Sequence, residues 1–180
     1  MNRLVALTLA AGLACSFAAH TVDIAGAAEP TPQALLTNAI LCKGDSLAIV
    51  RKMAASGSTQ FDRGVAAATF GEEMDEMSVV VLRSPIDIVG AKASSILLTF
   101  AQGEDFGALV YGRFRGDYKK VVSALKLVPT AQKDGLRLGH FTKAMAVDVD
   151  GRPDKVCPMT IALTPLENGT FLLGCGWCNG

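Results

Sequence analysis

The chain has 180 residues, and its 17 Lys and Arg side chains balance 17 Asp and Glu, so the formal net charge at pH 7 is zero. A neutral chain lacks the excess positive charge that binds nucleic acid or an anionic membrane surface, so we expect neither as its main partner. Its length suits one domain with a single buried core.

The first 27 residues have the pattern of a secretory signal peptide. Arg3 precedes a long apolar run over 4–19, and small residues lead to Ala25-Gly26-Ala27, an A-x-A cleavage pattern. We expect cleavage near Ala27, a single mature α+β domain over 28–180, and a periplasmic or secreted location. The apolar run is short for a membrane span and no later stretch is longer, so we expect a chain that does not span the membrane.

Four cysteines follow the signal peptide, Cys42, Cys157, Cys175 and Cys178. An even number in an exported protein indicates two disulfides, with three connectivities to choose from. We favour Cys42–Cys175 with Cys157–Cys178, because a C-terminal hairpin would place Cys175 and Cys178 on opposite faces. Cys15 could instead carry a lipid anchor, but the residues before it match a lipobox poorly.

The mature chain begins with two predicted helices, over 32–41 and over 47–55, the second capped by Asp45 or Ser46. Strands are then predicted over 61–70, 77–83, 86–90, 95–101 and 106–114. Asp117 caps a third helix, which Pro129 stops. A strand over 139–149 and a turn over 150–153 precede the last element.

That last element is a β-hairpin centred on Asn168-Gly169. A type I′ turn needs positive φ at both central residues, and apolar runs flank this pair on both sides. A two-residue loop predicts a register in which Ala162 lies opposite Cys175 and Leu163 lies opposite Gly174.

This order of elements predicts an α+β fold in which an antiparallel sheet packs against two or three helices. Disulfides are expected to cross-link this domain. Ile49-Val50-x-x-Met53 lies 72 positions before Val121-Val122-x-x-Leu125, which favours a duplicated αβββ unit. The layout resembles small disulfide-bonded exported α+β modules such as bacterial periplasmic inhibitors of hydrolases. That resemblance is architectural and implies an inhibitor-like binding protein.

Cys175-Gly176-Trp177-Cys178 has the spacing of a thiol–disulfide oxidoreductase site. That chemistry needs a stabilised thiolate, usually at the N-terminus of a helix, and a second cysteine that resolves the mixed disulfide. Here no helix is predicted to follow the pair and no βαβ unit precedes it. We therefore expect a structural role for Cys175 and Cys178 and keep redox catalysis as the alternative.

No metal or other cofactor is expected. His140 is the one histidine beyond the signal peptide, so a site with two histidines is excluded, and Cys42 and Cys157 do not form the second close pair that a zinc site needs. The carboxylates over 148–154 lack the spacing of a calcium loop. Arg113, Arg115, Lys119 and Lys120 form a basic cluster around Asp117 that could receive an acidic partner surface.

No catalytic constellation emerges from these residues. The sequence therefore favours an exported, non-enzymatic protein-binding or inhibitor-like module whose partner is another exported or envelope protein. A thiol–disulfide oxidoreductase and a carrier of small apolar ligands remain the alternatives.

Overall fold

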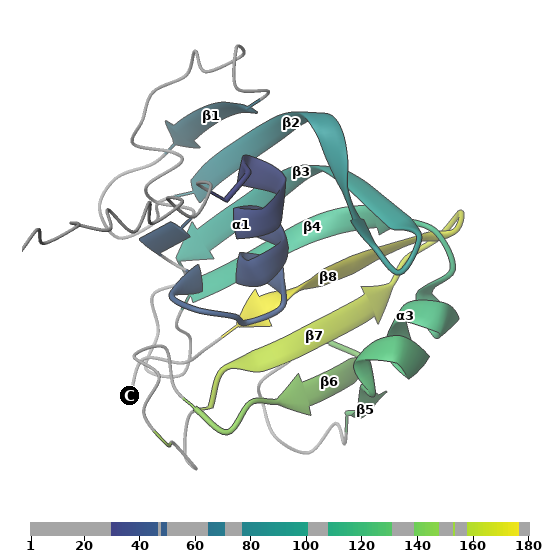
Figure 1. Ribbon diagram of the computed structural model, residues 1–180. Coiled ribbons are helices and arrows are strands. Elements are labelled where there is room, and N and C mark those ends of the chain that lie inside the picture. The colour runs from purple at the N-terminus through teal and green to yellow at the C-terminus, as the bar shows by residue number, and fades with distance from the viewer. Residues whose placement is uncertain are drawn as a thin grey trace, which may run out of the picture.

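The computed structural model describes residues 30–46, 48–49, 65–70, 77–100, 108–130, 139–147, 153 and 158–176. Over these ranges the fold is α+β, with helices α1 and α3 packed on an antiparallel sheet (Figure 1). The elements are α1 Pro32–Ile40, β1 Val65–Phe70, β2 Met77–Ile88, β3 Ala91–Phe100, β4 Ala108–Arg115, α3 Tyr118–Leu125, β5 Val128–Pro129, β6 Phe141–Ala144, β7 Thr160–Pro165 and β8 Thr170–Gly176. The predicted signal peptide lies outside the described residues.

The sheet has eight described strands in the order β1-β2-β3-β4-β8-β7-β6-β5, and neighbouring strands are antiparallel. The first four strands form one meander and the last four form another. The two meanders meet where β4 pairs with β8, so the centre of the sheet joins the middle of the chain to its C-terminal part (Figure 1).

The helices begin where their capping residues predict. The Asp117 carboxylate accepts a hydrogen bond from the Lys119 N–H at 3.0 Å and caps α3, and the Thr31 hydroxyl caps α1. Asp45 accepts from the Ala48 N–H at 2.8 Å at the start of the second predicted helix, most of which lies outside the described residues. The predicted stop at Pro129 is wrong, because α3 ends earlier, at Lys126 with φ 56°.

Both helices cover the same face of the sheet. The disulfide from α1 reaches the face of β8 that carries Cys175 and Leu173. Leu173 pairs with Leu163 on β7, and Leu163 pairs with Phe141 on β6, whose ring lies 6.1 Å from the ring of Tyr118 in α3. We call this side the helix face and the opposite side the outer face.

The core lies between the helices and the helix face. Its largest fully buried side chains are Phe114, Phe171, Leu36, Ile40, Ile86, Ile96, Leu163, Leu173, Val80 and Val110. Phe114 and Phe171 stack with ring centroids 5.6 Å apart, directly across the central strand pair. The core therefore spans both meanders and unites them in one cluster.

Several strand predictions differ from the structure. β3 begins at Ala91, four residues before the strand predicted over 95–101. The predicted strands 77–83 and 86–90 form one strand, β2, with a register shift between Val81 and Ile86. Strand β5 was not predicted, and it contains Pro129 at the edge of the sheet, where a missing N–H is tolerated. β6 is shorter than the predicted 139–149, although Val147 forms an isolated bridge with Pro153.

The Asn168-Gly169 turn forms as predicted, with φ values of 57° and 67°. The Thr170 N–H donates to the Glu167 carbonyl at 3.2 Å, as in a two-residue loop. The Thr170 carbonyl, however, accepts from the Leu166 N–H at 2.9 Å rather than from Glu167. Leu166 and Glu167 therefore both face Thr170, which is the arrangement of a β-bulge.

This bulge makes the predicted register wrong by one residue. Ala162 pairs with Gly174 and Ile161 pairs with Cys175, whereas the prediction paired Ala162 with Cys175. Leu163 pairs with Leu173 instead of Gly174. Because side chains alternate along a strand, the shift moves each β7 side chain to the other face relative to β8.

Candidate functional site

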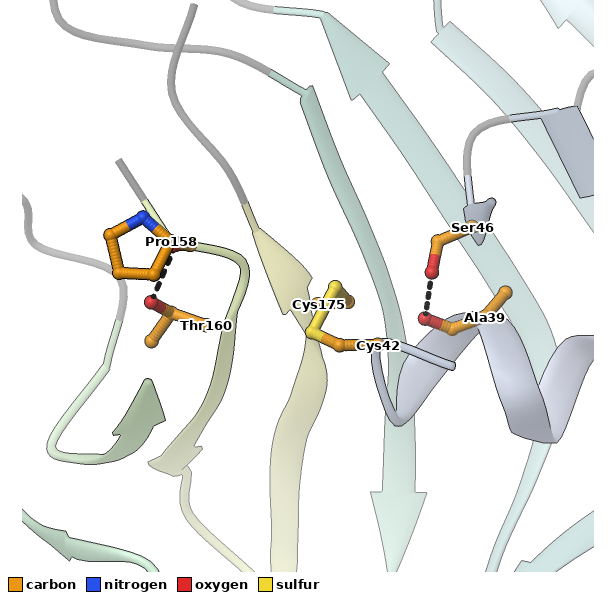
Figure 2. Close-up of a disulfide and its surroundings, with 6 residues drawn as sticks. All are labelled: Ala39, Cys42, Ser46, Pro158, Thr160 and Cys175. Atoms are coloured by element: carbon orange, nitrogen blue, oxygen red, sulfur yellow. Dashed lines mark hydrogen bonds between the residues drawn. A yellow bond between two sulfur atoms is a disulfide. The ribbon is translucent and has the colours of Figure 1, made fainter. Parts of the chain in front are cut away.

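The Cys42–Cys175 disulfide joins the end of α1 to β8 (Figure 2). The Cα atoms are 5.2 Å apart, and the two residues are separated by 133 positions in the sequence. Cys42 is 3% exposed and Cys175 is 1% exposed. This is the long-range pair favoured from the sequence.

Cys42 occupies a position that usually belongs to glycine. The Cys42 N–H donates to the Ala39 carbonyl at 3.2 Å, and the Lys43 N–H donates to the Asn38 carbonyl at 2.8 Å, the two hydrogen bonds of a Schellman motif. Its C′ residue is left-handed, and Cys42 has φ 53°. Such a conformation costs a non-glycine residue about 1–2 kcal/mol, so the cysteine is held there by its bond to β8.

Ser46 closes the turn around the disulfide. Its hydroxyl donates to the Ala39 carbonyl at 2.9 Å, and both residues are fully buried (Figure 2). The Ala39 carbonyl also accepts the Cys42 N–H, so the Ser46 hydroxyl adds a second hydrogen bond to it and holds the following segment against the helix. The surroundings of the disulfide are therefore packed and hydrogen-bonded, as in a structural bond.

This geometry weighs against the redox alternative. Reactive thiols are partly exposed and lie near positive charge or a helix N-terminus, whereas Cys175 is buried in a strand and bonded to Cys42. Cys175 could pair with Cys178 only after the bond to Cys42 opened. Cys157 and Cys178 lie outside the described residues, so their bond stays a prediction.

One row of residues crosses the outer face of the sheet from β2 to β5. The row is Val79, Leu97, Tyr111, Gly174, Ala162, Thr142 and Val128. Val79, Leu97 and Tyr111 are half-buried, and Val81, next on the same face of β2, is 47% exposed. The outer face therefore presents apolar surface that α1 and α3 do not cover.

Tyr111 is the largest side chain of this row. Partial burial raises the pKa of its phenol above the ordinary value of 10.0. Gly174 lies directly opposite, and a Cβ built on it would come within 2.5 Å of the Tyr111 Cβ. Only a glycine at 174 leaves room for Tyr111 at this point of the central strand pair.

Three basic side chains lie beyond the apolar row on the outer face. Arg113 and Arg115 follow Tyr111 by two and four residues, and Lys92 on β3 pairs directly with Arg115. All three are exposed, and within the described residues none forms an ion pair. We call this group the basic end. Asp87 is opposite Lys92, but its carboxylate accepts from the Gly90 N–H at 2.7 Å.

The β2–β3 hairpin turns next to the basic end. Its two central residues, Val89 and Gly90, have φ values of 56° and 80°, as in a type I′ turn. A β-branched residue at positive φ is an outlier, and Val89 is also 47% exposed. The hairpin thus holds an apolar side chain in solvent in a strained conformation.

The basic cluster predicted around Asp117 is divided in the structure. Arg113 and Arg115 are on the outer face, whereas Lys119 and Lys120 are exposed on α3, which packs on the helix face. Lys92, which the sequence analysis missed, joins the two arginines through the β3–β4 register. That register is a long-range pairing, and no local signal predicts it.

His140, which was considered as a metal ligand, is exposed, and its backbone N–H donates to the Leu163 carbonyl at 2.9 Å. In the part of the chain that the structure describes, no group of three or more His, Cys, Asp or Glu side chains could hold a metal ion. Among the same residues, no helix has the length and apolar character to cross a membrane.

Comparison with known proteins finds no matching family model, no matching curated protein and no matching solved structure. A functional conclusion therefore has to come from the geometry of this chain, in which the outer face is the most distinctive surface.

Proposed function

We propose that this protein is an exported, non-enzymatic binding module that engages another exported or envelope protein through the outer face of its sheet. The observation that carries the proposal is the partly buried apolar row at Val79, Leu97 and Tyr111, with Val81 exposed beside it. Contiguous exposed apolar surface on a soluble domain commonly marks an interaction site. An aromatic side chain with apolar neighbours is the typical centre of such an interface.

The location outside the cytoplasm belongs to the same proposal. The A-x-A pattern at Ala25-Gly26-Ala27 supports export, and the buried Cys42–Cys175 bond fits an oxidising compartment. Mass spectrometry of protein from the exported fraction should give a chain that begins at Ala28. An intact N-terminus in that fraction would contradict the export route.

An internal duplication is part of the proposal. The sequence predicted a repeated αβββ unit, but each half of the sheet has four described strands, so the proposed unit is a helix followed by four strands. The supporting symmetry is in the sheet order, where β1–β4 and β5–β8 meet through their last strands. Asp45 and Asp117, 72 positions apart, each accept a main-chain N–H at the start of a helix. Asp45→Ala and Asp117→Ala should then lower the free energy of unfolding by similar amounts, about 1 kcal/mol each. A loss confined to one of them would count against equivalent halves.

The binding proposal is tested with two matched valine variants. Val81 is 47% exposed on the outer face of β2, and Val128 is 60% exposed on β5 at the far edge of the sheet. The mature protein is immobilised and exposed to envelope extract of the native host. We expect Val81→Asp to reduce capture of the partner about tenfold or more, because it places a charge in the apolar interface. Val128 ends the same row, but β5 lies six strands from β2 and outside the proposed interface at Val79, Leu97 and Tyr111. Val128→Asp should therefore capture as much partner as wild type.

If wild type and Val81→Asp capture equal amounts of partner, the proposal that the partner binds to the outer face is wrong. No specific capture by any variant would overturn the binding function itself. Circular dichroism of both variants shows whether a loss of capture reflects a loss of fold.

A further inference from the structure

Three basic side chains, Lys92, Arg113 and Arg115, gather at the basic end of the outer face. Asp87 is directly opposite Lys92 on β2, and its carboxylate accepts the Gly90 N–H. Among the described residues, the border of the apolar row therefore carries a local excess of positive charge.

The arrangement of the basic end brings like charges together. Lys92 and Arg115 are directly opposite on adjacent strands, and like charges in that position are destabilising. Arg113 and Arg115 are two residues apart on one face of β4, so about 7 Å separates their Cα atoms. None of the three forms an ion pair within the described part of the chain. A ligand that carries negative charge would relieve this repulsion.

The apolar neighbours define what kind of ligand fits. Arg113 pairs with Leu172, which is half-buried on the outer face of β8, and the apolar row begins two residues away at Tyr111. Val89 stands exposed in the adjacent hairpin. An inorganic anion or a purely acidic chain would leave these apolar side chains in water.

We propose that the partner contacts the outer face with a segment that combines acidic and apolar side chains, the carboxylates on the basic end and the apolar groups along the row at Tyr111 and Leu97. The inference rests on the proposed binding function and specifies the chemistry of the partner. Carboxylates pair with arginine through two parallel hydrogen bonds, which gives this contact direction as well as charge. Burial of the apolar side chains supplies the non-directional part of the affinity.

The test uses a defined probe and the full mature protein. A fluorescent peptide of alternating Glu and Val is titrated with the protein, and fluorescence anisotropy reports binding. The matched peptide replaces every Glu with Gln. A third peptide replaces every Val with Ser and so keeps the charge without the apolar side chains. We expect the Glu–Val peptide to bind, and both the Gln–Val and the Glu–Ser peptides to bind at least about tenfold more weakly.

Two double charge reversals localise the site. R113E/R115E should weaken binding of the Glu–Val peptide by about tenfold or more, whereas R113K/R115K should keep most of it. K119E/K120E makes the same change in net charge on α3, on the other side of the sheet, and should leave binding within about twofold at physiological salt, where the screening length is about 8 Å. Thermal unfolding of each variant controls for loss of structure.

Several outcomes would overturn the inference. If R113E/R115E and K119E/K120E weaken peptide binding equally, the peptide responds to the net charge of the protein and does not bind at the basic end. Binding to phosphatidylglycerol vesicles with no binding to the Glu–Val peptide would make the ligand a lipid surface. If R113E/R115E unfolds more easily and the peptide never binds, acidic residues of the chain itself are the counter-charges. The Glu–Val peptide could fail to bind while Val81→Asp still abolishes capture of the partner. That result would contradict the acidic character of the partner segment and leave the proposed binding function standing.

Discussion

Tyr111 on β4 lies directly opposite Gly174 on β8, and a Cβ added at 174 would come within 2.5 Å of the Tyr111 Cβ. That Cβ would also overlap the carbonyl oxygen of Val110. Because backbone atoms of the central strand pair cannot move aside cheaply, Gly174→Ala forces β4 and β8 apart. We expect the variant to lose about 2 kcal/mol of unfolding free energy, within the range of overpacked cores, as measured by urea denaturation.

Gly112→Ala is the matched control for that prediction. A Cβ at 112 would meet the Ile96 Cδ1 and Phe114 Cε2 atoms at 3.0 Å, and these side-chain ends can shift by a few tenths of an ångström. The loss should therefore be smaller than for Gly174→Ala. If Gly112→Ala proved the more damaging of the two, close approach of β4 and β8 would not be the reason for Gly174.

The Cys42–Cys175 bond should contribute strongly to stability. It closes a loop over a sequence separation of 133, and chain-entropy estimates for a loop of that length are about 5 kcal/mol, less any native-state strain. Cys42→Ala with Cys175→Ala should lower the urea midpoint. The m-value should rise, because the unfolded chain exposes more surface without the cross-link. Peptide mapping without reductant should recover Cys42 linked to Cys175.

The same mapping examines the remaining cysteines. A Cys157–Cys178 peptide would confirm the second predicted bond. Recovery of Cys175 linked to Cys178 in the native protein would contradict the structural bond and would return the redox alternative to first place.

Features determined by a few adjacent residues were predictable from the sequence. The Asp117 cap identified the start of α3, because a carboxylate there accepts a main-chain N–H of the first turn. Asn168-Gly169 identified the hairpin turn, because both residues tolerate positive φ. The long-range disulfide was also predicted, from the even number of cysteines in a chain expected to be exported and from the strand that carries Cys175.

Features that depend on distant partners were not predictable in this way. The register of β7 and β8 depends on one hydrogen bond, from the Leu166 N–H to the Thr170 carbonyl, which the Asn-Gly pair does not encode. The basic end exists because Lys92 pairs with Arg115. The apolar outer face did leave a signal, since Val79-Val80-Val81-Leu82 is apolar without alternation, as in strands with apolar side chains on both faces.

Tyr111 should make stability depend on alkaline pH. Burial raises the pKa of its phenol above 10.0, so the folded chain holds this proton more tightly than the unfolded chain. The corresponding stability is fully present below pH 10 and is lost as the pH rises through the folded pKa. Denaturant unfolding between pH 9 and pH 11 should show a smaller decline for Tyr111→Phe than for wild type. Tyr118→Phe, which keeps Tyr111, is the control, and equal declines in all three proteins would contradict the assignment.

Val89 links stability to the proposed binding surface. At φ 56° a valine is strained, whereas asparagine adopts this conformation readily in type I′ turns. Because Val89 is 47% exposed, its replacement removes little buried surface. We therefore expect Val89→Asn to raise the free energy of unfolding by about 1 kcal/mol, measured by urea denaturation. If the hairpin takes part in binding, the same variant should capture less partner than wild type, a gain in stability accompanied by a loss of function. A variant that is stabilised and binds fully would exclude the hairpin from the interface, and one that is destabilised would show that the turn is not strained at Val89.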